Sequence, residues 1–225
     1  MTISIAGRCA QTGMIGVAIS SSSICVAARC AWVQAGAGAV LTQNITNPAL
    51  GADGLALLAS GQTASETLAA LLQREAYPEY RQLILLDAHG NSAQHSGAKC
   101  LGQHTTAIGQ ACIAAGNMLA NLHVPQAMTQ AFAASAGHLA ERLLQALLAG
   151  QTAGGEVGPL YSAGVLVAHE QAWHVVNLRV DWAEAADPIQ RLYAMWQRYQ
   201  PQMQDYIIRA VSPSVAPSYG VPGDP

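Results

Sequence analysis

The start of this 225-residue chain holds the residue with the clearest chemical potential, Thr2. A methionine before a small residue is usually excised, so we expect Thr2 to become the first residue of the mature chain. A threonine hydroxyl is a weak nucleophile by itself, but an adjacent amine can accept its proton, directly or through a water. The α-amine of a terminal residue has an ordinary pKa of about 7.7–8.0, which suits a base near neutral pH. Thr2 and its own amine therefore predict nucleophilic catalysis.

Further hydroxyl groups are expected beside Thr2, because the first twenty residues predict a hairpin. Residues 10–13 have turn composition and lie between two short apolar runs, which is typical of a β-hairpin. If Cys9 lies opposite Met14, then Thr2 lies opposite Ser21, within a run of four serines. Ser21 and Ser20 would then orient the amine or bind substrate. The alternative is that the serines form only a polar strand end, and the pattern leaves both interpretations open.

A tetrahedral intermediate needs hydrogen-bond donors aimed at its oxyanion. Asn117 is the best candidate donor, because it follows Gly116 at the expected end of a strand and glycine lets the backbone approach closely. Asn44, beside Gln43, is the second choice. The alternative for Asn117 is an ordinary turn asparagine.

Further polar residues are candidates for binding substrate. Arg179 and Asp181 alternate on one expected strand and share a face. They could bind a substrate carboxylate and its counter-charge, or form a structural ion pair with Arg81, and we favour the structural role because a buried arginine must be paired. The remaining candidate substrate contacts are Ser4, Ser20, Gln43 and Asn44.

Other catalytic arrangements are weaker. Ser4 or Cys25 could act as an internal nucleophile in the same cleft, but no histidine near Cys25 supplies the pairing that activates a thiol. His89, His95 and His104 match no metal-ligand spacing. We therefore expect neither a metal nor a cofactor.

The elements that must position these residues follow from the apolar runs and the turn and capping signals. Their order is strands, two helices, strands, two helices, strands and a helix. It fits two antiparallel sheets stacked face to face with helices on both outer faces, a four-layer αββα sandwich of the α+β class. Strands covered on both faces would also explain why the runs show little alternation. The expected hairpins span 2–20, 81–96 and 162–181, a strand pair 24–46 and a strand region 106–117. The expected helices span 48–61, 63–75, 125–148 with a break at Gly137, and 188–200.

Composition indicates one domain that buries much of its surface. Charged residues make up 10% of the chain, against roughly 25% in an average globular protein. We expect a single domain over residues 1–200 and an extension over 201–225. Four prolines follow Ser212 and exclude regular structure there, so the tail either is disordered or lies on a partner subunit. Low charge, this tail and the apolar positions of the last helix (Leu192, Met195, Trp196 and Tyr199) predict a homo-oligomer, most simply a dimer.

The same composition argues against several partners. The formal net charge is −3 and Lys99 is the sole lysine, so the clustered positive charge that binds nucleic acid is missing. No apolar run approaches the ~20 residues that span a bilayer, and residues 1–4 do not resemble a signal peptide. Five cysteines without a CxxC pair fit neither a disulfide framework nor a zinc site. We expect a soluble cytoplasmic protein that binds a small molecule and neither nucleic acid nor membrane.

Several motifs, taken in order, resemble those of the bacterial "domain of unknown function 1028" family over about residues 2–195. They are the sequences at 2–6, 12–18, 35–40, 42–43, 81–83, 116–119 and 178–181. The resemblance implies an N-terminal-nucleophile hydrolase fold and an activity that is unknown or is amide hydrolysis. In such enzymes the nucleophile is the first residue of the mature chain, which implies that role for Thr2.

The chain departs from proteasome-like proteins in one respect. Those proteins use a lysine near the nucleophilic threonine, and this sequence places no lysine there. Lys99 lies in an expected loop, so the α-amine would act as base alone. The leading hypothesis is a small-molecule amide or ureide hydrolase with Thr2 as nucleophile. The rival is a non-catalytic ligand-binding or assembly protein on the same fold.

Overall fold

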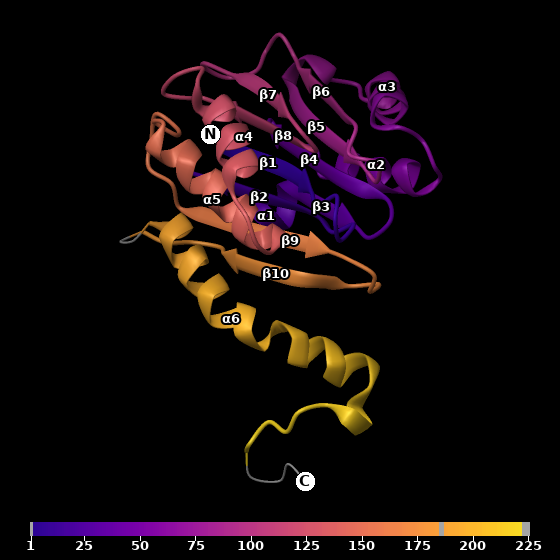
Figure 1. Cartoon of the computed structure of the whole chain (residues 1–225). Coiled ribbons are helices and arrows are strands. Elements are labelled where there is room, and N and C mark those ends of the chain that lie inside the picture. The colour runs from indigo at the N-terminus through magenta and orange to yellow at the C-terminus, as the bar shows by residue number, and fades with distance from the viewer. Residues whose placement is uncertain (1, 185–186, 222–225) are drawn as a thin grey trace.

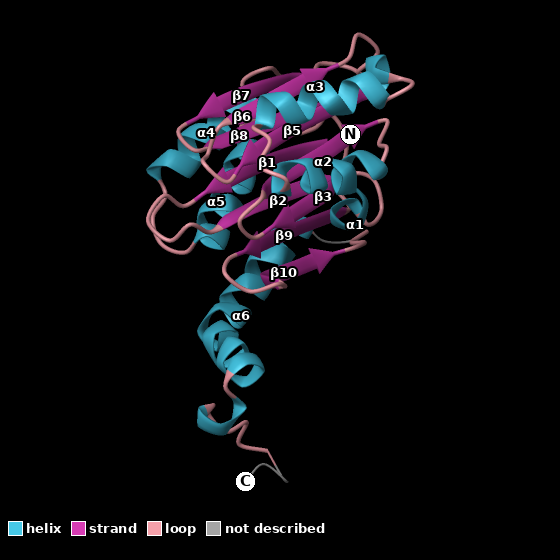
Figure 2. Ribbon diagram, turned by 90° about the vertical axis from the view of Figure 1, so that its right-hand side faces the viewer, coloured by secondary structure: helices cyan, strands magenta, loops and turns pink. Residues whose placement is uncertain are grey.

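The computed structural model describes residues 2–184 and 187–221. Two antiparallel sheets face each other, and helices cover their outer faces (Figures 1 and 2). The six-stranded sheet has the order β10–β9–β2–β1–β8–β7, and the four-stranded sheet the order β3–β4–β5–β6. The α+β class and the four layers expected from the sequence are confirmed. The strands are β1 (Thr2–Arg8), β2 (Ile15–Ser21), β3 (Ala31–Gln34), β4 (Gly38–Asn44), β5 (Arg81–Asp87), β6 (Ser92–Ser96), β7 (Thr105–Gly109), β8 (Cys112–Asn117), β9 (Ser162–Ala168) and β10 (His174–Val180).

Strand β1 lies in the interior of the large sheet, between β2 and β8. Its two faces meet different layers, because successive side chains of a strand point to opposite sides. Ile3 and Ile5 pack with the outer helices, whereas Ala6 packs in the core between the sheets. Both faces are buried, which is why the run is apolar with little alternation.

Two pairs of helices cover the sheets. Helices α2 (Ala49–Ala59) and α3 (Ala64–Arg74) cover the small sheet, and α4 (Val124–Ala134) and α5 (Leu139–Thr152) cover the large one. The expected capping box of α3 is present: Thr63 Oγ1 accepts from the Glu66 backbone N–H, and the Glu66 carboxylate accepts from the Thr63 N–H. Two reciprocal bonds of this kind satisfy donors that the first turn leaves unpaired.

The expected elements differ from the structure in two places. The region expected to begin as a strand at residue 24 instead forms a short helix, α1 (Val26–Cys30), before β3 starts. The helix expected to end near Gln200 continues through Pro201 as α6 (Pro188–Val211). Its C-terminal half projects away from the sheets (Figure 1). Short 3-10 helices form at η1 (Pro78–Tyr80) and η2 (Pro213–Val215). The expectation of no regular structure after Ser212 is therefore wrong for one turn, because proline is compatible with the first turn of a helix. Pro222 and Pro225 lie outside the described residues.

Candidate active site

A row of polar side chains crosses four strands at one end of the large sheet. Asn117 of β8 lies opposite Thr2 of β1, Thr2 lies opposite Ser21 of β2, and Ser21 lies opposite Ser162 of β9. Directly opposed residues of antiparallel strands project to the same face. That face looks toward the small sheet, since Ser4, two residues along β1, bonds to Gln43 of β4. The register that the hairpin predicts for Thr2 and Ser21 is therefore present.

Thr2 is enclosed by this row. Its side chain is buried, and the hydroxyl oxygens of Thr2 and Ser21 are 3.2 Å apart. Ser21 is itself held from two sides, because its Oγ accepts from the Ser23 backbone N–H at 3.1 Å and its carbonyl accepts from the Tyr161 N–H at 2.9 Å. The sheet and the following turn thus hold the Ser21 hydroxyl next to the Thr2 hydroxyl.

A chain of amides links Asn117 to the opposite sheet. Gln82 of β5 is fully buried, and its Oε1 accepts from Asn117 Nδ2 at 3.0 Å and from Gln43 Nε2 at 2.8 Å. Gln82 Nε2 donates to the Gly116 carbonyl at 3.0 Å and to Ser96 Oγ at 3.2 Å. At the far end, the Ser4 hydroxyl donates to Gln43 Oε1 at 2.7 Å. The network fixes the Asn117 amide beside Thr2 and ties the two sheets together at this edge.

One acceptor of the network is left over. Asn117 Oδ1 is buried and has no hydrogen-bond partner among the described residues. A buried carbonyl oxygen without a donor costs free energy, so this atom is suited to accept a hydrogen bond from a group that joins the site. Asn117 Nδ2 carries two hydrogens, and its hydrogen bond to Gln82 uses one of them.

Two of the candidates are used elsewhere. Ser20 lies opposite Ile3, on the face of the sheet that meets the helices, and its hydroxyl donates to the Ser162 carbonyl at 2.9 Å. Asn44 has a φ of 72°, and its amide donates to the Tyr80 carbonyl and accepts from the Leu101 backbone N–H. Asn44 therefore fixes a loop, and neither side chain joins the row beside Thr2.

Arg179 and Asp181 form an ion pair with each other at 2.8 Å. Both are well exposed, and Arg179 lies three strands away from Ser4 along the row through Ile19 and Gly164. The expected pairing with Arg81 is wrong.

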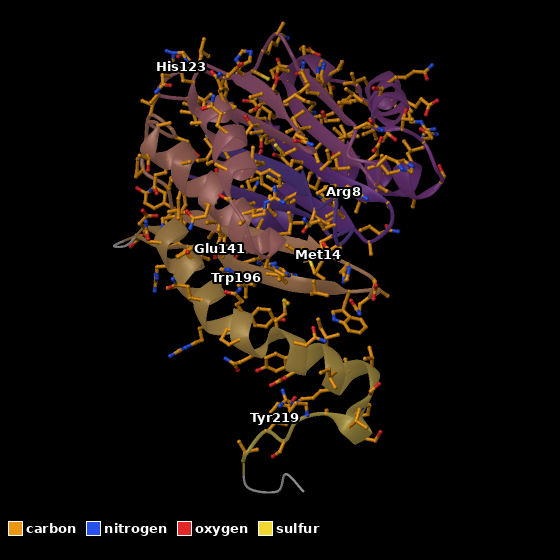
Figure 3. The ribbon with its side chains drawn as sticks, in the orientation of Figure 1. Arg8, Met14, His123, Glu141, Trp196 and Tyr219 are labelled. Carbon is orange, nitrogen blue, oxygen red and sulfur yellow. The ribbon has the colours of Figure 1, made fainter. Side chains whose placement is uncertain are left out.

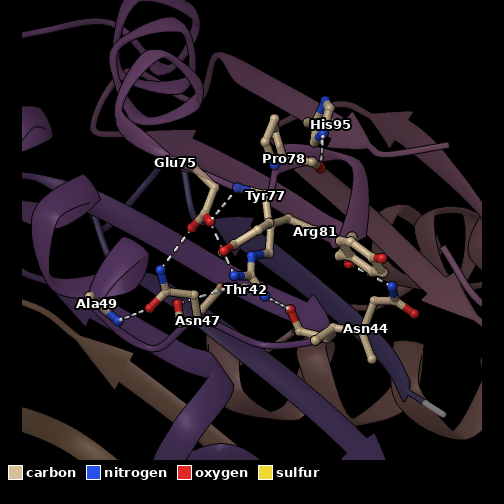
Figure 4. A network of polar contacts seen from close by, with 11 residues as sticks. Thr42, Asn44, Asn47, Ala49, Glu75, Tyr77, Pro78, Arg81 and His95 are labelled. Carbon is tan, nitrogen blue, oxygen red and sulfur yellow. Dashed lines mark hydrogen bonds and ion pairs between the residues drawn. The ribbon is translucent and has the colours of Figure 1, made fainter. Parts of the chain in front are cut away.

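Arg81 instead pairs with Glu75 at 3.1 Å and donates to the Ile45 carbonyl at 2.6 Å (Figure 4). The reason is topological: Arg81 begins β5 in the small sheet, whereas Arg179 lies on β10 in the large sheet.

The cysteines and histidines lie apart from this row. Burial raises the pKa of the Cys30 thiol, and Cys25 precedes α1 with a left-handed φ of 54°. In the part of the chain that the structure describes, no three His, Cys, Asp or Glu side chains lie together as ligands for a metal would.

Glu156 is a buried carboxyl near this row that the sequence did not reveal. It is 7% exposed, and it forms an isolated antiparallel bridge with Leu119, two residues beyond Asn117. Burial raises its pKa to about 8, opposed first by the positive chain terminus and then by Ser22. The Ser22 N–H and hydroxyl lower the pKa, although neither reaches hydrogen-bonding geometry with a carboxylate oxygen. The signal available in the sequence was the glycine pair that precedes it, but no apolar periodicity marks this loop.

Together these features define a class of protein: an αββα sandwich with a polar row at the end of the interior strand β1 and the threonine at its centre. The chain belongs to the family of unknown function DUF1028, whose model matches residues 2–192. No curated protein matches the chain.

One solved structure of the same family resembles the chain over most of its length. The crystal structure of protein SPO2555 from Silicibacter pomeroyi, also a DUF1028 protein, is 31% identical with a TM-score of 0.84, and the match covers 91% of this chain and 89% of that one. Anbu (ancestral beta-subunit) from Yersinia bercovieri is 13% identical over 91% of this chain and 97% of its own, with a TM-score of 0.39. Anbu from Hyphomicrobium is 10% identical over 89% and 95%, also with a TM-score of 0.39.

Proposed function

We propose that this protein is an N-terminal-nucleophile hydrolase that cleaves a C–N bond in a small amide or ureide. The observation that carries the proposal is the row in which Thr2 lies between Ser21 and Asn117. The three side chains come from adjacent strands, so the sheet holds the reacting groups without a mobile loop. Such preorganisation is what places a nucleophile and its donors at reacting distance.

In the proposed reaction, removal of Met1 exposes the Thr2 α-amine. This amine takes the proton of the Thr2 hydroxyl, whose oxygen attacks the carbonyl carbon of the substrate. The second hydrogen of Asn117 Nδ2 stabilises the oxyanion, and Ser21, 3.2 Å from the Thr2 hydroxyl, orients the nucleophile. The tetrahedral intermediate collapses, the C–N bond breaks and the protonated amine returns its proton to the leaving nitrogen. A water then hydrolyses the ester on Thr2.

The surroundings support a small substrate. Thr2 is 5% exposed, and Ser4 and Gln43 are further polar side chains that project toward the same inter-sheet space. All five cysteines are free thiols, which fits a reducing cytoplasm. Among residues 2–184 and 187–221, no helix is both long enough and apolar enough to cross a membrane.

Substitution of Thr2 tests the proposal, once a screen of small amides, ureides and cyclic imides has given a substrate. Thr2→Ala keeps a small second residue, so Met1 is still removed and the α-amine remains, but the nucleophilic oxygen is lost. We expect turnover to fall by at least 10³-fold, as for the loss of a covalent nucleophile. Thr2→Ser keeps the hydroxyl and should retain measurable turnover. Equal rates for Thr2→Ala and the wild type would place the nucleophile elsewhere.

A further inference from the structure

Glu156 lies at the end of the large sheet where β1 starts. In the large sheet, β1 runs between β2 and β8. Glu156 bridges to Leu119, just beyond the end of β8, and its carboxyl faces Ser22, just beyond the end of β2. Thr2, at the start of β1, lies between those two strand ends, opposite Asn117 and Ser21. The carboxyl therefore lies at the end of the large sheet where Thr2 begins β1.

The backbone around Glu156 is held rigidly. The Gly155 carbonyl accepts from the Ala120 N–H at 3.1 Å, and the Val157 N–H donates to the Met118 carbonyl at 3.1 Å. Gly155 has a φ of 57°, a conformation that residues with a Cβ rarely adopt. A Cβ on Gly154 would lie 2.7 Å from Asn121 Nδ2. The turn thus fits only glycines and fixes the direction of the next side chain.

The carboxyl has no described partner that would explain its burial. Both Glu156 oxygens are buried without a hydrogen bond among the described residues. A carboxyl taken out of water without a partner is strongly destabilising, so such a group usually marks a place where a ligand or a cation completes the site. Removal of Met1 would create a new cation, the Thr2 ammonium, at this strand end.

We propose that Glu156 is a positioning residue whose carboxyl binds the α-amine of mature Thr2 and holds it beside the Thr2 hydroxyl. The inference rests on the proposed function, because it needs Met1 to be removed. The carboxylate on one side and the buried, unpaired Asn117 Oδ1 on the other would accept two amine hydrogens. The amine lone pair would then be directed toward the Thr2 hydroxyl.

The sign of the electrostatic effect follows from the charges. A carboxylate beside an amine favours the ammonium form and raises the pKa of the amine. Two further acidic residues, Glu184 and Asp187, line the same cavity of about 500 Å³ as Glu156. Asp187 caps α6 through the Ile189 N–H, and Glu184 is exposed. Removing the charge at Glu156 should therefore lower the midpoint of the amine, whereas removing the exposed charge at Glu184 should not.

Competitive acetylation of the tag-free protein tests this directly. The α-amine and Lys99 are its only primary amines, so Lys99 is an internal reference and the Thr2 midpoint is read from the pH profile of labelling. We expect Glu156→Gln to lower that midpoint and to raise the Thr2-to-Lys99 labelling ratio at pH 7 about tenfold. Glu184→Gln is the matched control and should leave both unchanged. If the substitution only changed the access of the reagent to Thr2, labelling would change by the same factor at every pH and the midpoint of the pH profile would not move.

The outcomes separate the two proposals. Intact Met1 on the wild-type chain overturns the proposed function and this inference with it. If Met1 is removed but the α-amine has the same titration midpoint in Glu156→Gln as in the wild type, the inference alone is overturned.

If Glu156→Gln does not fold, carbon-13 titration of the Glu156 carboxyl in the wild-type chain decides. Acetylating the α-amine removes the ammonium and should raise the carboxyl midpoint. An unmoved midpoint overturns the inference.

Discussion

Gln82 is the side chain on which the site's hydrogen-bond network converges. Its oxygen accepts from both Gln43 and Asn117, so Gln82→Ala leaves two buried amide donors unpaired and opens a cavity between the sheets. We expect a loss of about 2–4 kcal/mol in the free energy of unfolding, measured by urea denaturation. Gln94→Ala, at an exposed position of β6, should stay within about 0.5 kcal/mol of the wild type. Equal effects of the two substitutions would contradict the network.

Some residues of the site could be predicted from the sequence, and others could not. Turn composition sets the register of the first hairpin, so the position of Ser21 opposite Thr2 was predictable. Gln82 was not, because its partners lie on three other strands and one of these strands belongs to the other sheet. Glu156 was not predictable either, since a loop between a helix and a strand carries no periodic signal. The catalytic roles of Thr2, Ser21 and Asn117 stay predictions.

At the scale of elements, α2 lies unusually close to the small sheet. A Cβ built on Gly51 would lie 2.0 Å from the Trp32 ring of β3. A glycine in a helix normally costs about 1 kcal/mol relative to alanine, but here Gly51→Ala should destabilise the protein by about 1–3 kcal/mol through overpacking. The measurement is the thermal or urea unfolding midpoint. A gain in stability would mean that the helix does not approach the strand as described.

A comparison within α2 isolates the cause. Ala52 is the exposed neighbour of Gly51, so Ala52→Gly changes helix propensity without changing the contact with Trp32. It should cost about 1 kcal/mol.

The elements themselves were mostly predictable, because capping and turn signals are local. The capping box at Thr63 and the break near Gly137 between α4 and α5 both occur as expected. Helix α1 was missed because a five-residue helix is too short to show a 3.6-residue period. The continuation of α6 past Pro201 was missed because proline usually ends a helix. There the preceding turns pack Tyr199 against the core.

At the scale of the whole molecule, we propose that the projecting half of α6 is a surface for self-association. Leu192 and Trp196, expected to face a partner, are instead fully buried in the chain's own core, where Trp196 Nε1 donates to Glu141 at 2.8 Å (Figure 3). Exposed apolar side chains occur further along, at Tyr206 and Val211. A dimer through this end of α6 stays a proposal, supported by the apolar surface that it would cover.

Light scattering tests that proposal. We expect twice the chain mass for the wild type and a shift toward the monomer, by at least tenfold in the dissociation constant, for Tyr206→Glu, because a buried unpaired carboxylate opposes association. Gln204→Glu adds the same charge at a neighbouring exposed position and should leave the dimer intact. A monomeric wild type would refute the dimer.

Catalysis at Thr2 depends on cleavage of the peptide bond between Met1 and Thr2, since the proposed mechanism needs a free α-amine beside the Thr2 hydroxyl. The most direct measurement is the intact mass of the tag-free protein purified from its native source. We expect a mass lower than that of the full sequence by one methionine residue. Full retention of Met1 would contradict it and would favour a ligand-binding or assembly protein that shares the fold.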